Sequence, residues 1–245
     1  FIHIPPDEID QRKSDDELLR EHPGYFIYRT GNYPGKKDRE VRILVHHGAY
    51  SYNNFVWIDT AQIDYRKKEV RAHMASVMPY WTKNFRIDGF RIDMANYLVN
   101  SEVERRWGKL EAGISEEFFE RAIREVKKVK PSVGVIGEAY GYFDQLSETG
   151  FDVLYDKNDG DTSKGQIGFY DALATGDIYR IKEALQYIVF KKWQKGGATA
   201  LSFISNHDEE DPYKKFGNYY KRFMILSSIV SSPFMMYNGQ ERGIS

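Results

Sequence analysis

Three acidic residues follow short apolar runs of the kind that form buried strands. Asp93 ends the run Gly89 to Asp93 (GFRID), Glu138 follows Val133 to Gly137 (VGVIG), and Asp208 closes Phe203 to Asp208 (FISNHD). The acids are separated by about 45 and about 70 residues, which is roughly one and two strand-helix units of an α/β barrel. Because parallel strands end at the same edge of a sheet, we expect these carboxylates to meet there.

The first acid has a cation beside it. Residues i and i+2 of a strand share a face, so Arg91 and Asp93 are predicted to point the same way. A guanidinium within a few ångströms lowers the pKa of a carboxyl group and keeps it ionised, as a nucleophile requires. A purely structural Arg-Asp pair that closes the strand end remains open as the alternative.

The second and third acids have different surroundings. Glu138 lies between Gly137 and Ala139, where apolar neighbours raise the pKa of a carboxyl group and small ones admit a ligand, as suits a general acid. Alternatively, Glu138 caps the next helix. Asn206, His207 and Asp208 place an amide, an imidazole and a carboxylate at one strand end.

One ionised and one protonated carboxyl group are the apparatus of glycoside hydrolysis. With a third acid present, we expect a retaining double displacement. Asp93 attacks the anomeric carbon, Glu138 protonates the leaving oxygen and then activates the acceptor, and Asp208 holds substrate hydroxyls and favours the oxocarbenium-like state.

These side chains need a parallel sheet to position them. Candidate strands lie at 1–4, 86–93, 132–138, 151–155, 199–206 and 233–237, and candidate helices at 14–21, 65–85, 115–130, 177–192 and 219–230. Strands that alternate with helices favour repeated βα units. These six candidate strands are fewer than the eight of a closed barrel. Either two strands of a barrel lie upstream of Phe1, or the strands form an open doubly wound sheet. The segment between 5 and 65 is predicted to be loop-rich.

Composition excludes several other functions. Lys+Arg 35 against Asp+Glu 36 gives a net charge of −1, which disfavours nucleic-acid binding. The absence of cysteine excludes thiolate metal sites and cysteine nucleophiles, and no Gly-rich phosphate motif follows any strand. No apolar run approaches the ~20 residues of a membrane helix, so we expect a soluble protein without a membrane partner and favour the cytoplasm over secretion.

The motifs around the three acids, together with Gly239 to Glu241 (GQE), resemble in their order the motifs of the α-amylase superfamily of (β/α)8 glycoside hydrolases and transglycosylases. Trp57 to Tyr65 also resembles the approach to the third helix in that family. The resemblance covers nearly the whole chain from about Pro5.

The resemblance implies a fold and a set of roles. It implies that residues 1–245 form a TIM-type (β/α)8 catalytic domain, apparently without its first two strands, and that 5–64 is the loop-rich, B-type excursion after the third strand. Asp93 is then the nucleophile, Glu138 the acid/base and Asp208 the transition-state stabiliser, with Arg91 and His207 assisting.

Two departures from the family pattern affect substrate and calcium contacts. Where members have an Asp and then Pro-Asn-His, this chain has Ile2 and then Pro5, Pro6 and Asp7, without the substrate His or the calcium-binding Asn. After the nucleophile, Asn96 and Tyr97 replace a common Lys-His pair. The sequence requires no cofactor, and structural calcium stays open.

The expected substrate is an α-1,4-glucan or maltodextrin, with transfer of glucosyl or maltosyl units and a catalytically silent carbohydrate-binding homologue as alternatives. Oligomeric state is not predicted. The candidate substrate-binding residues are Arg91, Asn96, Tyr97, Tyr140, Asn206 and His207. We predict no metal ligands, because adjacent His46 and His47 cannot readily turn to one ion and the acidic run Asp156 to Asp161 lacks the downstream Glu of a calcium loop.

Overall fold

The computed structural model describes residues 2–3, 20–33, 36–46, 60–157, 168–194, 197–230 and 233–242. The chain divides into two compact units. The first comprises Phe1–Met74 and Val103–Ile114, and the second comprises Ala75–Glu102 and Ser115–Ser245. In the described part of the chain, no helix combines the length and apolar character needed to cross a membrane.

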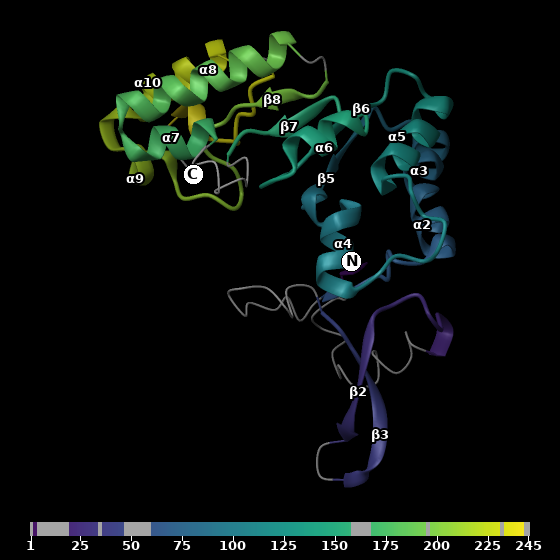
Figure 1. Cartoon of the computed structure of the whole chain (residues 1–245). Coiled ribbons are helices and arrows are strands. Elements are labelled where there is room, and N and C mark those ends of the chain that lie inside the picture. The colour runs from purple at the N-terminus through teal and green to yellow at the C-terminus, as the bar shows by residue number, and fades with distance from the viewer. Residues whose placement is uncertain are drawn as a thin grey trace. The chain divides into compact units, whose positions relative to one another are not determined.

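A four-stranded parallel sheet is the centre of the second unit (Figure 1). Its order is β5 (Gly89–Ile92), β6 (Gly134–Gly137), β7 (Val153–Tyr155) and β8 (Thr199–Leu201), which is also the order of the chain. A parallel bridge between Ser202 and Phe234 continues the sheet beyond β8. The strands predicted near 86–93, 132–138, 151–155 and 199–206 are therefore confirmed, and the one at 233–237 is reduced to a bridge.

Helices connect these strands, as parallel pairing requires. The elements η2 (Ala95–Leu98), α4 (Asn100–Trp107) and α5 (Phe118–Val129) follow β5, and α6 (Phe143–Glu148) follows β6. Next come α7 (Phe169–Thr175) and α8 (Ile178–Gln194) after β7, then α9 (Pro212–Phe216), η4 (Gly217–Tyr219) and α10 (Tyr220–Val230) after β8, and finally η5 (Gln240–Arg242). The helices predicted at 115–130, 177–192 and 219–230 are confirmed as α5, α8 and α10.

Two apolar clusters hold the helices against the sheet. On α5, Phe119 is buried and meets Phe151, just before β7, with ring centroids 5.0 Å apart. The second cluster joins β7 and β8 to α7–α10, which lie together beside them in Figure 1. There Phe203 stacks on Tyr170 at 5.3 Å. These clusters fix the strand ends that carry the acids.

The first unit is built from antiparallel pairs. Strand β1 (Ile2–His3) pairs with β4 (Thr60–Ala61), and β2 (Tyr28–Tyr33) pairs with β3 (Lys36–Leu44). The prediction that 1–4 belongs to the parallel sheet is thus wrong, because a short apolar run does not show which strand it will pair with. Within the segment predicted to be loop-rich, the paired strands β2 and β3 were not predicted.

One predicted helix is divided. Instead of a single helix over 65–85, α2 (Lys68–Ala75) and α3 (Val77–Phe85) meet at Ser76, and α3 ends at Arg86 in the left-handed conformation (φ 56°). The sequence carries no sign of this break, because apolar spacing continues through it.

Of the helix predicted at 14–21, only residues 20–21 are described, and both are helical. Residues 57–59 and 158–161, which belong to the Trp57–Tyr65 motif and to the acidic run, lie outside the described residues.

Candidate active site

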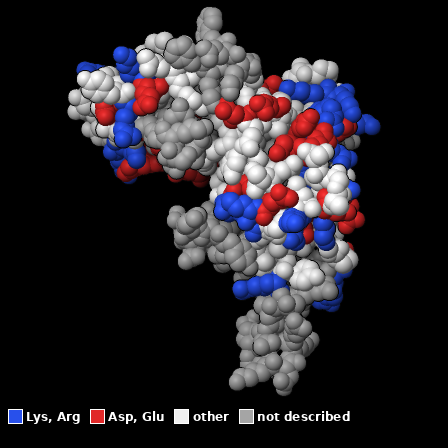
Figure 2. All heavy atoms as spheres, viewed as in Figure 1, with Lys and Arg blue, Asp and Glu red and all other residues white. Residues whose placement is uncertain are grey.

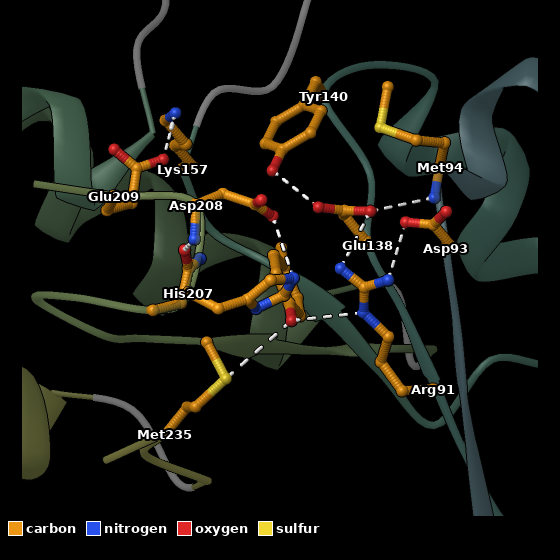
Figure 3. Close-up of polar contacts among 12 residues, drawn as sticks. Arg91, Asp93, Met94, Glu138, Tyr140, Lys157, His207, Asp208, Glu209 and Met235 are labelled. Carbon is orange, nitrogen blue, oxygen red and sulfur yellow. Dashed lines mark hydrogen bonds and ion pairs between the residues drawn. The ribbon is translucent and has the colours of Figure 1, made fainter. Parts of the chain in front are cut away.

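Arg91 joins two of the three acids at the carboxyl end of β5. Its Nη1 donates to Asp93 Oδ1 at 2.6 Å, and its Nη2 lies 2.9 Å from Glu138 Oε2 (Figure 3). Arg91 and Asp93 share a side, as the alternation predicts. Because β5 and β6 are paired in parallel with Ile92 opposite Gly137, one guanidinium reaches carboxylates from both strand ends.

The two carboxyl groups have contrasting environments. The side chain of Glu138 is 3% exposed, whereas that of Asp93 is 49% exposed. Burial, followed by the neighbouring Asp93 carboxyl, raises the pKa of Glu138, while the Met94 N–H, the Tyr140 hydroxyl and Arg91 oppose that rise. The site therefore places a buried carboxyl group with a raised pKa beside a solvent-facing one, and such a contrast allows two carboxyl groups to take different chemical roles.

The backbone after Asp93 takes a conformation that non-glycine residues seldom adopt. Met94 is left-handed, with φ 45° and ψ 46°, at a typical cost of about 1–2 kcal/mol. This turn aims the Met94 N–H at Glu138 Oε2, 2.9 Å away, and the next N–H, of Ala95, donates to the Glu138 carbonyl at 2.7 Å. The sequence carries no signal for this contact, because methionine does not mark a left-handed position.

Tyr155, at the end of β7, is a further member of the site that sequence reasoning missed. Its hydroxyl accepts from Arg91 Nε at 3.4 Å and donates to Met235 Sδ at 3.8 Å, and the Arg91 guanidinium carbon lies 5.6 Å from its ring centroid. Burial lowers the pKa of Arg91, but hydrogen bonding to Tyr155 and the charge of Glu138 outweigh it and raise that pKa. The available signal was its place at the end of a predicted strand.

The third acid is carried by the loop after β8. Asp208 and His207 are exposed, with Asp208 Oδ2 lying 3.1 Å from His207 Nε2. Asn206 is buried, and its Oδ1 accepts from the Asp208 backbone N–H at 2.8 Å. Its Nδ2 is buried without a hydrogen-bond partner among the described residues. Asn206 thus shapes the loop that presents Asp208, and its predicted contact with substrate stays a prediction.

The remaining predicted residues surround Glu138. Tyr140 donates its hydroxyl to Glu138 Oε1 at 2.8 Å, and its backbone N–H donates to Asn96 Oδ1 at 3.3 Å. Asn96 is buried in η2, and Tyr97 beside it is half-buried. The structure gives Tyr140 and Asn96 a bracing position around the acid, and a sugar contact at either residue, or at Tyr97, stays a prediction.

The chain belongs to the alpha-amylase family, because the model of the alpha amylase catalytic domain matches residues 25–245. Family membership and the likeness to solved structures identify the parallel sheet as part of a (β/α)8 barrel fold.

Individual relatives are distant and longer. The chain is 23% identical over 181 residues to a maltogenic alpha-amylase of Bacillus acidopullulyticus, covering 72% of this chain and 28% of that protein. It is 32% identical over 110 residues to the 1,4-alpha-glucan branching enzyme GlgB of Bacillus caldolyticus, covering 44% and 14%. The maltogenic alpha-amylase AmyB of Thermotoga neapolitana superposes with a TM-score of 0.54 at 22% identity, over 94% of this chain and 44% of that one. The chain thus spans less than half the length of these relatives.

Proposed function

We propose that this chain carries the active site of a retaining glycoside hydrolase that cleaves α-1,4-glucosidic bonds in glucans or maltodextrins. The observation that carries the proposal is the single guanidinium of Arg91 bridging an exposed Asp93 and a buried Glu138 whose pKa is raised. The family assignment and the names of the two relatives, a maltogenic amylase and a branching enzyme, support the substrate class.

In the first half-reaction, the Asp93 carboxylate attacks the anomeric carbon while Glu138 transfers its proton to the leaving glycosidic oxygen. The glycosidic bond breaks and an ester forms between the sugar and Asp93. In the second, the Glu138 carboxylate accepts a proton from water as the water oxygen attacks the same carbon. The ester bond breaks, Asp93 is released, and two inversions leave the α-configuration unchanged.

Other residues are assigned roles within this proposal. Asp208 binds sugar hydroxyls and stabilises the oxocarbenium-like state, with His207 beside it. Arg91 orients Asp93 through the 2.6 Å ion pair. Asn206, Asn96, Tyr97 and Tyr140 line or brace the substrate site.

The proposal also covers domain organisation. Residues 1–245 would be part of the (β/α)8 catalytic domain, with 5–64 as a small B-type subdomain. The compact first unit and its β2–β3 hairpin support a distinct subdomain. No cofactor is needed in this reaction, since protons and the covalent bond are handled by carboxyl groups.

Transfer to a sugar acceptor is a second candidate, because the chain also matches a branching enzyme. The two reactions share the Asp93 ester and differ only in what attacks it. A catalytically silent homologue is less well supported, because the contacts around Arg91 and Glu138 are complete in the way acid catalysis needs.

The test is a time course of anomeric proton NMR on maltoheptaose with the full chain. Shorter sugars that first appear as α-anomers would support retaining hydrolysis, and sugars longer than the substrate would support transfer. Glu138→Gln should abolish turnover, whereas Glu183→Gln, an exposed residue of α8, should retain it. First-formed β-anomers, or no turnover by folded wild-type protein, would overturn the proposal.

A further inference from the structure

Lys157 links the ends of two strands beside the proposed active site. It follows β7 by two residues and forms an ion pair with Glu209, from the loop after β8 (Figure 3). The side chains of Lys157 and Glu209 are 26% and 11% exposed, so the pair is largely screened from water. Neither residue belongs to the three proposed catalytic acids.

The same ammonium group lies over the ring of Tyr140, whose hydroxyl group contacts Glu138. Lys157 Nζ lies 5.4 Å from the ring centroid of Tyr140 and 5.7 Å from that of Tyr170. Both distances are within the range in which a cation is attracted to an aromatic face. Tyr140 in turn donates its hydroxyl to Glu138 Oε1 at 2.8 Å. A continuous line of contacts therefore runs from Glu209 through Lys157 and Tyr140 to Glu138.

We propose that Lys157 is a positioning residue that acts through Tyr140 to hold and tune the proton of Glu138. It contacts no reacting atom in the proposed mechanism, so the inference rests on the proposed function and extends it. A cation beside the ring draws electron density from the phenol and makes its O–H a stronger donor. A stronger donor stabilises the Glu138 carboxylate, which forms in the first half-reaction and is reprotonated in the second.

The charges around Glu138 decide the direction of the effect. Burial, then the Glu138 hydrogen bond, then the charges of Glu138, Asp208 and Glu209 raise the pKa of Tyr140 and keep it a hydroxyl. Without Lys157, the negative charge of Glu209 is left uncompensated near Tyr140, whose O–H becomes a weaker donor. The pKa of Glu138 should then rise. Among the described residues, the charged or titratable groups that act on Glu138 or Tyr140 are Arg91, Asp93, Lys157, Asp208 and Glu209.

The first test compares Lys157→Met with Lys157→Arg. Lys157→Met should lower kcat about tenfold at neutral pH with a smaller change in KM, and it should move the alkaline limb of kcat/KM to higher pH. Lys157→Arg keeps the cation and should restore most of the wild-type kcat and of the wild-type pH profile. Lys128→Met removes an exposed lysine paired with Glu125 on α5 and should change neither kcat nor the pH profile. A loss of thermal stability in Lys157→Met with an unmoved pH profile would overturn the proposal.

A second measurement does not require turnover. The carboxyl carbon of Glu138 is titrated by ¹³C NMR, with its signal assigned by loss in Glu138→Gln. Lys157→Met should raise this titration midpoint, and in a Tyr140→Phe background the same substitution should have no further effect. An unchanged midpoint in an active protein would overturn the role of Lys157 alone. A shifted midpoint in a protein that does not cleave maltoheptaose would overturn the proposed function and leave the positioning inference standing.

Discussion

At the residue scale, the arrangement around Glu138 explains how two carboxyl groups of the same chemistry can take opposite roles. Asp93 is half exposed and paired, whereas Glu138 is buried and surrounded by donors. Desolvation disfavours the charged form of Glu138 more strongly than its partners favour it, which is why its pKa is raised. In the proposed mechanism, the two roles therefore follow from depth below the surface rather than from residue type.

This difference predicts how stability depends on pH. Burial raises the pKa of Glu138 in the folded state above its ordinary value of 4.5, so between that pH and the raised pKa the folded state binds more protons than the unfolded state. The free energy of unfolding should therefore fall as pH rises through this window, relative to Glu138→Gln, which cannot titrate. Urea unfolding of both proteins from pH 4 to 8 measures the difference.

The variant serves as its own control, because every other carboxyl group titrates in both proteins. If the wild-type protein instead gained stability relative to Glu138→Gln as pH rose, the ion pair with Arg91 would outweigh desolvation. The direction of the pKa shift would then be wrong.

At the element scale, the end of β6 that precedes Glu138 packs closely against β7. A Cβ at Gly137 would come within 2.6 Å of Leu154 Cδ2 and 2.8 Å of Phe151 Cε1, both from the β7 region. Gly134, on the same strand, has no atom within 4 Å of the corresponding position. The strand therefore needs glycine beside the acid and tolerates a side chain at its beginning.

Gly137→Ala should destabilise the protein by about 1–3 kcal/mol, because the side chains of Phe151 and Leu154 must shift. Gly134→Ala should have a much smaller effect and is the matched control. Thermal unfolding followed by circular dichroism measures both. Equal losses from the two substitutions would mean that backbone freedom, rather than the close packing of β6 against β7, accounts for the glycine.

At the scale of the whole molecule, charge and exposed apolar surface govern association. The formal net charge at pH 7 is −1, and Figure 2 shows Lys and Arg interspersed with Asp and Glu on the visible face. A net charge this close to zero gives little mutual repulsion. Ile225 and Ile229, one turn apart on α10, are 57% and 76% exposed. These apolar side chains favour self-association.

Ile229→Glu should therefore reduce light scattering at neutral pH with little change in melting temperature. Ser228→Glu, at the neighbouring exposed position of α10, adds the same charge without removing apolar surface and separates the two causes. Equal improvement from both variants would show that net charge, and not the apolar side chain, limits solubility.

Sequence patterns predicted the parallel strands well, because each is a short apolar run ended by glycine or a polar residue, and they also predicted α5, α8 and α10. They failed for the β2–β3 hairpin and for the pairing of Ile2–His3. Strand pairing depends on a partner far along the chain, and local periodicity carries no record of that partner. The break at Ser76 was missed for the opposite reason, since apolar spacing continues through it.

The sequence alone determined which acids could do chemistry, because Asp93, Glu138 and Asp208 each follow a strand and parallel strands end together. Only the tertiary structure decided the environment of Glu138, whose burial raises its pKa. The contacts that Met94 makes with Glu138, Tyr155 with Arg91, and Lys157 with the Tyr140 ring join residues distant in sequence. The physical reason is that desolvation and electrostatic interaction depend on distance in space, which residue spacing along the chain does not specify.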